Sequence, residues 1–188
     1  LNLQAAMFGD AAVAAMSIVG RCGNLLFSFA LGIAQGFQPI CAFNYGAGKH
    51  DRVKKSALFT ILFGMGVMGA LCAVCDLFAV EIIRLFREEE SVGKVGADAF
   101  HWMCRTLYFL PISAVGSMLF QSIGKKGRSF FIAALQSGCI SIPCMLILPN
   151  LFGIAGIQMA QPCAYLIAGA LTIPVLLLFF KQENKKIT

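Results

Sequence analysis

Charged residues are scarce in this sequence of 188 residues. They make up 13% of the chain, whereas soluble domains average about 25%, and 59% of the residues are hydrophobic. This composition excludes an ordinary soluble domain. We therefore predict an all-α multi-pass membrane protein, in which the unit to count is the membrane span rather than the domain.

The sequence also lacks the residue groups of common enzymes. It shows no grouping of Ser, His and an acid, which argues against an enzyme embedded in the membrane. Residues 46–49 resemble part of a phosphate-binding loop, but Phe43 stands where a glycine is required and His50 where Ser or Thr should follow. Cys72 and Cys75 form one C-x-x-C pair with no second pair, so we expect neither a metal nor another cofactor.

Long apolar runs predict five complete spans. Residues 56–75 carry no charge, and residues 129–180 carry none in 52 positions, which is long enough for two crossings of about 20 residues each. The break between those two crossings is expected at 149–153, where Pro, Asn and Gly gather. The spans are expected at about 11–36, 56–77, 97–124, 129–148 and 154–180.

Several segments around the spans have their own predictions. Residues 1–8 are too short to cross and are interpreted as the end of a truncated first helix. Pro111 predicts a kink in the third span, and Pro162 and Pro174 predict kinks in the fifth. The charge run at 86–94 predicts a solvated loop.

The net charge of +6 follows the loops rather than a nucleic-acid-binding surface, so no nucleic acid partner is expected. Cytoplasmic loops of membrane proteins are rich in Lys and Arg. Ten of the fifteen basic residues fall after the first span, after the third span and in the tail 181–188. The tail is therefore predicted to be cytoplasmic, in a cell membrane whose lipid surrounds the spans. These ten residues are Lys49, Arg52, Lys54, Lys55, Lys125, Lys126, Arg128, Lys181, Lys185 and Lys186.

Polar residues form a stripe along the first span. Their spacings of four, three, four and seven place them on one helical face. An arginine in a membrane helix favours a protein interior or a wet cavity, so the stripe is interpreted as part of a substrate pathway. The alternative is that Arg21 ties two helices together through backbone carbonyls. The stripe consists of Ser17, Arg21, Asn24, Ser28 and Gln35.

Two further polar faces leave alternatives open. In the third span, Asp98, His101, Arg105 and Tyr108 fit either a proton-sensing site around the histidine or an interfacial belt with Trp102. In the fifth span, one face is equally consistent with substrate contact and with helix packing. That face consists of Gln158, Gln161, Tyr165 and Thr172.

Residues 32–53 cover the end of the first span and the loop that follows it, and within them residues 35–48 are predicted to form a rigid, non-helical corner. Glycine permits positive φ, and proline removes a backbone donor. The segment reads G-I-A-Q-G-F-Q-P-I-C-A-F-N-Y-G-A-G-K-H-D-R-V. Its motif residues are Gly32, Gln35, Gly36, Gln38, Pro39, Asn44, Tyr45 and Gly46.

This segment resembles the signature after the eighth helix of the multidrug and toxic compound extrusion family. Residues 121–125 and the Gly-Ile-Ala-Gly-Ile run at 153–157 resemble two later family segments, in matching order. The sequence departs from the family pattern at Gln136, where Arg is common, and at Gln158, where Trp is common. The region around Pro111 also lacks the acidic residue of the sodium-linked branch.

The resemblance implies the C-terminal six-helix lobe of a twelve-helix transporter. It implies export of organic, cationic drugs or toxins by antiport with protons or sodium, with the missing N-terminal lobe as partner and as the place of the coupling ion. One alternative is a flippase for lipid-linked precursors or oligosaccharides of the same superfamily, which should line its cavity with several basic residues. A second is a fragment of a channel or receptor.

Overall fold

The computed structural model describes residues 9–86 and 90–184, and within these ranges the chain is helical and has no strand. The predicted helix end at 1–8 lies outside the described residues. Four helices are long and apolar enough to cross a membrane, and a bent pair makes a fifth. The predicted all-α membrane class is confirmed. The elements are α2 (Asp10–Gly46), α3 (His50–Leu77), α4 (Ala79–Phe86), α5 (Glu90–Leu107), α6 (Leu110–Ser122), α7 (Lys126–Ala134), the π-helical turn η2 (Leu135–Cys139), α8 (Ser141–Phe152) and α9 (Ile154–Asn184).

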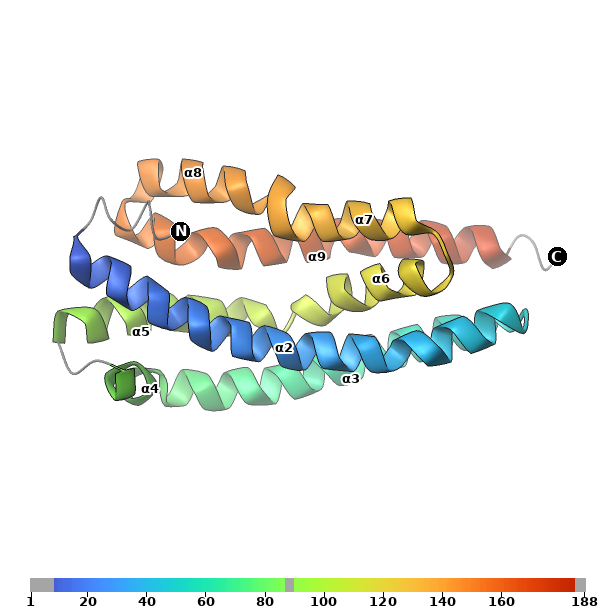
Figure 1. Cartoon of the computed structure of the whole chain (residues 1–188), viewed down its shortest axis with the longest axis horizontal. Helices are drawn as coiled ribbons and strands as arrows, with labels where there is room; N and C mark the ends of the chain where they lie inside the picture. Colours follow the sequence, from blue (N-terminus) through green and yellow to red (C-terminus); the bar gives the residue numbers. More distant parts are fainter. Residues whose placement is uncertain (1–8, 87–89, 185–188) are drawn as a thin grey trace.

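The long helices run roughly along one axis (Figure 1). In that view α7, α8 and α9 lie above, α2, α3, α4 and α5 lie below, and α6 lies between the two groups. The α2–α3 turn, the α6–α7 turn and the end of α9 meet at one end of the molecule. The described members of the three groups of basic residues, which exclude Lys185 and Lys186, therefore share one end.

The non-helical corner predicted at 35–48 is wrong over most of its length. Helix α2 continues through Gly36 and Pro39 as far as Gly46, and the turn comes only at 47–49. Proline costs α2 a single hydrogen bond, while Phe37 and Cys41 on either side of it are almost fully buried against neighbouring helices. Among the glycines of this segment, Gly48 in the turn has a positive φ, of +69°.

The kink predicted near Pro111 is present. Helices α5 and α6 are bent by 50° at a short break, and α5 ends at Leu107, the residue whose carbonyl the proline ring displaces. The charge run differs from its prediction, because α4 extends to Phe86 and α5 begins at Glu90. A charged segment can be helical where it extends beyond the apolar span. Residues 87–89 lie outside the described part.

The fourth span contains a π-helical turn that was not predicted. The N–H of Ile140 donates to the carbonyl of Leu135 at 3.3 Å, and the hydroxyl of Ser141 donates to the carbonyl of Gln136 at 2.7 Å. Pro143 follows, and its ring displaces the carbonyl four residues before it. The hydroxyl thus satisfies a backbone acceptor in the reshaped turn.

The break between the fourth and fifth spans, predicted at 149–153, is confined to Gly153, which has a positive φ of +60°. Pro149 lies inside α8, which ends at Phe152. Helix α9 runs without interruption to Asn184. Residues 181–184 are therefore helical and continue the fifth span, whereas they were predicted to belong to a separate tail. Residues 185–188 lie outside the described part.

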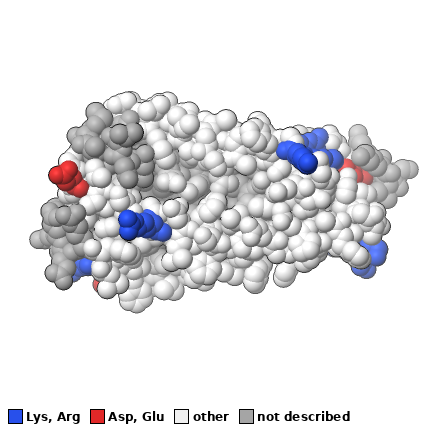
Figure 2. All heavy atoms as spheres, viewed as in Figure 1, with Lys and Arg blue, Asp and Glu red and all other residues white. Residues whose placement is uncertain are grey.

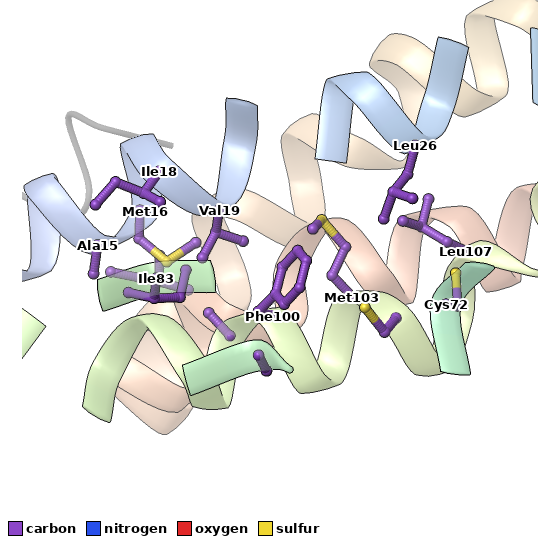
Figure 3. Packing of buried hydrophobic residues seen from close by; sticks show 14 of the residues in the cluster. Ala15, Met16, Ile18, Val19, Leu26, Cys72, Ile83, Phe100, Met103 and Leu107 are labelled. Carbon is purple, nitrogen blue, oxygen red and sulfur yellow. The ribbon is translucent and has the colours of Figure 1, made fainter. Parts of the chain in front are cut away.

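The largest core cluster joins α2 to α3, α4 and α5. Figure 3 shows Met16 of α2 directed toward Ile83 of α4, and Leu26 directed toward Leu107 of α5. Phe100 of α5 is also buried in this cluster. One face of α2 is thus fixed by the core, so the opposite face is left for other contacts.

Candidate functional site

A polar cavity lies between α2, the η2–α8 segment and α9. Its volume is about 240 Å³, and Figure 2 shows the corresponding face hollowed between α2 and the upper helices. The apolar part of its lining is Phe27 and Met145. The polar part consists of Asn24, Gln136, Ser137, Ser141, Gln161 and Tyr165.

The polar lining is held in place by local hydrogen bonds. The amide of Gln161 donates to the hydroxyl of Tyr165 at 2.9 Å, one turn further along α9. The hydroxyl of Ser141 donates to the backbone carbonyl of Gln136 at 2.7 Å, and that of Ser28, outside the lining, donates to the backbone carbonyl of Asn24 at 2.9 Å. The lining therefore offers amides and hydroxyls, which can both donate and accept hydrogen bonds.

The structure brings together three of the residues that the sequence analysis placed on a substrate pathway. Asn24 comes from α2, while Gln161 and Tyr165 come from α9. The periodicity of each helix identified its polar face, and the fold places those two faces side by side. Their role in transport stays a prediction.

Arg21 lies one turn before Asn24 on the exposed face of α2. Within residues 9–86 and 90–184 its guanidinium forms no hydrogen bond or ion pair. The alternative in which Arg21 ties helices through backbone carbonyls therefore finds no such bond in the described part of the chain. The side chain is exposed in the described part of the chain.

Other pathway candidates lie away from the cavity. Gln158 is buried, and its amide donates to the carbonyl of Val95 at 3.0 Å, which joins α9 to α5. Thr172 bonds within α9. Ser17 and Gln35 lie on α2 about two turns or more from Asn24, on opposite sides of it. These residues pack helices or lie further along the polar face.

The motif residues of α2 contact the end of the lobe where the basic residues gather. The amide of Gln38 lies 2.9 Å from the sulfur of Met118 and 3.3 Å from Oε1 of Gln121 on α6. The ring of Tyr45 meets the ring of His50 edge-on at 5.1 Å. The motif therefore joins α2 to α6 and α3, rather than lining the cavity.

His101 has a partner that the sequence did not indicate. Its Nδ1 lies 2.6 Å from Oδ1 of Asp76 on α3, whereas the spacing along α5 had pointed to Asp98. The guanidinium of Arg105 lies 5.9 Å from the ring of Trp102, as an interfacial belt would have it. Among the described residues no group of three or more His, Cys, Asp or Glu is placed to hold a metal ion.

Sequence reasoning missed Gln136, Ser137 and Ser141 as cavity residues. They were three polar side chains within an otherwise apolar span, which was the available signal. Helical periodicity did not group them with the other polar faces because the π-helical turn changes the direction of the side chains that follow it.

The sequence profile of the MatE family matches residues 1–147, which is more than half of the chain. The chain belongs to the MatE family. Multidrug export protein MepA of Staphylococcus aureus strain N315 is 25% identical over 159 residues, which are 84% of this chain and 34% of MepA. MepA of Staphylococcus haemolyticus strain JCSC1435 is 25% identical over 158 residues, again 84% of this chain and 34% of that protein. The MatE chain thus spans about a third of the length of these curated relatives.

Solved structures show the same fold. The MATE transporter VcmN of Vibrio cholerae in its bent form superposes with a TM-score of 0.88 at 22% identity, over 96% of this chain and 41% of VcmN. A MOP superfamily transporter from Pyrococcus furiosus superposes with a TM-score of 0.90 at 18% identity, over 97% of this chain and 42% of that one. The family predicted from residues 32–53 is confirmed, although the MatE segment is helical where a corner was expected.

Proposed function

We propose that this chain forms the C-terminal lobe of a secondary active transporter that exports organic compounds across the cell membrane in exchange for protons or sodium. The observation that carries the proposal is the polar cavity, where Asn24 on α2 faces Gln161 and Tyr165 on α9. A transport pathway needs polar groups on an exposed face of an otherwise apolar bundle. Membership of the MatE family supplies the class of activity.

An N-terminal lobe of the same transporter is the proposed partner, facing the exposed side of α2. Aromatic side chains such as Phe59 and Phe63 on α3 are more than half exposed, which suits contact with membrane lipid. We place the coupling ion in the partner lobe, because the bend at Pro111 is lined by apolar neighbours such as Ile112. The C-terminus is proposed to be cytoplasmic, and the preference for cations implied by the resemblance stays a prediction.

The cavity lining argues against the flippase alternative. A flippase of lipid-linked precursors would need several basic residues around its cavity to hold phosphates. The described lining contains no lysine or arginine, and Arg21 is the single basic residue of α2.

The proposal is tested with the complete transporter reconstituted in proteoliposomes. We expect an imposed proton or sodium gradient to drive accumulation of organic dyes against their own gradient, and an uncoupler or a sodium ionophore to abolish it. A channel or receptor would give no accumulation beyond equilibrium, and that result would refute the proposal.

Variants connect the activity to the cavity. Asn24→Ala and Gln161→Ala should reduce the initial rate of accumulation at unchanged protein abundance. Asn150→Ala is the matched control, because Asn150 is an exposed amide at the far end of α8 that bonds only its own helix. Equal rates in all three variants would show that the cavity residues do not contribute to transport.

A further inference from the structure

An apolar groove lies between α3, α6 and α9, on a different side of the lobe from the polar cavity. Its volume is about 330 Å³, and its described lining contains no residue of α2. The proposed partner lobe faces the exposed side of α2, so the walls of this groove come from three described helices of this chain. In Figure 1 the start of α3 and the end of α9 both lie at the end of the molecule where the basic residues gather.

Two matching stripes form the walls of the groove. On α3 the lining residues are Lys54, Ala57, Leu58 and Ile61, which recur at the spacing of one helical face. On α9 four lining residues between Ile173 and Phe180 repeat the same spacing. The groove therefore runs along two helices for about two turns.

The floor of the groove is closed, while its walls are open to the membrane. Ala57 and Leu176 in the floor are only 1% and 6% exposed, and Ile112 of α6 is buried beside them. Leu58 and Leu177 on the two walls are 55% and 64% exposed. An alkyl chain that lay between these walls would contact apolar side chains of both helices and would cover surface that is otherwise open.

The depth of the groove matches one leaflet of a bilayer. Lys54 lies in the second turn of α3, and Ile61 lies about 10 Å further along the helix axis. One leaflet contributes about 15 Å of hydrocarbon. With Ile61 in the hydrocarbon, the long side chain of Lys54 can extend its ammonium group to the level of the lipid headgroups.

The charges around the mouth of the groove favour an anion. Lys54 is in the lining, and Lys181, which is exposed, follows Phe180 on α9. The described lining has no carboxylate. Asp51 lies one turn before Lys54, on the side away from the groove's deep end. Glu183 is buried and lies 3.2 Å from the ammonium group of Lys125.

We propose that this groove holds an acyl chain of an anionic phospholipid, whose phosphate group binds Lys54. Basic residues at the mouth of a pocket between membrane helices attract anionic headgroups, and the apolar walls bind the chain. The lipid lies on the outside of the helix bundle as a bound lipid and is not the exported compound. The inference therefore goes beyond the proposed transport function and does not depend on it.

Quenching of tryptophan fluorescence by brominated lipids tests this inference at the groove itself. The complete transporter, with its native tryptophans replaced by phenylalanine, is reconstituted in phosphatidylcholine vesicles that contain brominated phosphatidylcholine or brominated phosphatidylglycerol. Leu177→Trp places the reporter on the groove wall. Leu178→Trp is the matched reporter, because Leu178 is the next residue of α9, is 60% exposed and lies outside the described lining.

We expect Leu177→Trp to report about fivefold tighter binding of phosphatidylglycerol than of phosphatidylcholine, the contribution of one lysine near the membrane surface. Leu178→Trp should report nearly equal binding of the two lipids. The same preference at both reporters, or none at either, would overturn the inference. Quenching of Leu178→Trp without quenching of Leu177→Trp would show that protein covers the groove, which would also overturn it.

Two lysine variants locate the headgroup. In the Leu177→Trp background, Lys54→Gln should remove the fivefold preference, and it should leave the binding of phosphatidylcholine unchanged. Lys55→Gln is the matched control, because Lys55 is the neighbouring exposed lysine and lies outside the described lining. A preference that survives Lys54→Gln, or that is lost equally in both variants, would assign it to the general basic surface of this end and would overturn the site.

Discussion

The Nζ of Lys125 lies 3.2 Å from Oε1 of Glu183, although 58 positions of sequence separate the two residues. The side chain of Glu183 is only 4% exposed, and its second oxygen lies 3.4 Å from Nδ1 of His50. One buried carboxylate therefore connects the starts of α3 and α7 with the end of α9. This connection holds together the end of the lobe at which the basic residues gather.

Replacing this carboxylate should loosen that end. Glu183→Gln removes the charge that Lys125 and His50 face, and hydrogen bonds to charged groups contribute about 1.5–3 kcal/mol each. We expect the free energy of unfolding to fall by about 1.5 kcal/mol, because Lys125 remains 32% exposed to solvent. Thermal unfolding of the complete transporter in detergent measures the effect. Lys126→Met, which changes a neighbouring exposed lysine, should leave the melting temperature in place; a melting temperature unchanged in both variants would contradict the prediction.

Gly64 on α3 allows the bent α5–α6 pair to pack closely. A Cβ added at Gly64 would lie 2.9 Å from Cβ of Pro111, a rigid ring that cannot turn away. Gly64→Ala should therefore cost about 1–3 kcal/mol of stability through overpacking. In the same helix, Gly66 has open space around it, so Gly66→Ala should stabilise by up to about 1 kcal/mol. Opposite shifts of the melting temperature are expected, and equal shifts would show that the contact does not matter.

Gly48 and Gly36 should respond in opposite ways to substitution. Gly48 has a φ of +69°, where an L-residue loses about 1–2 kcal/mol, so Gly48→Ala should destabilise the α2–α3 turn. Gly36 is an exposed helical position with nothing close to a new Cβ, and Gly36→Ala should gain about 0.5–1 kcal/mol. Melting curves compare the two. A loss of stability in Gly36→Ala would support the corner that the sequence predicted.

The orientation of the lobe can be measured by cysteine labelling. In a background without the eight native cysteines, Glu81→Cys on α4 and Gly127→Cys on α7 place exposed thiols at opposite ends. Because basic loops favour the cytoplasm, an impermeant maleimide should label Glu81→Cys in intact cells and Gly127→Cys only after permeabilisation. The reverse labelling would invert the proposed topology.

The sequence allowed the all-α membrane class of the fold to be predicted, because uncharged runs of about 20 residues match the thickness of the hydrocarbon core. It placed helix ends less well. Helix α3 begins at His50 and α9 extends to Asn184, since helical hydrogen bonds continue past the apolar stretch. The two prolines show a further limit: α2 continues through Pro39, whereas the chain breaks next to Pro111. Whether a proline is accommodated within a helix or breaks it depends on the packing of neighbouring helices, which the local sequence does not show.

The candidate site was predictable on the two helices with regular periodicity. Asn24 and Gln161 were found because their polar faces repeat along α2 and α9. The pair of Asp76 with His101 joins α3 to α5, and the carboxylate of Glu183 joins three helix ends, so neither could be read from one helix at a time. Gln136 was noted only as a departure from the family pattern, and its position in the cavity depends on the π-helical turn.

The π-helical turn also affects how the sequence of this chain aligns with that of a relative that lacks the turn. A π-helical turn contains one residue more than an α-helical turn, so it rotates all that follows by about 100°. Deleting one residue among Leu135–Cys139 would carry Cys144 from the core toward lipid, and would separate Ser141 from the cavity. A relative without the extra residue would align with this chain only across a one-residue gap at this place. The polar wall that η2 adds to the cavity therefore depends on the length of this segment as well as on its side chains.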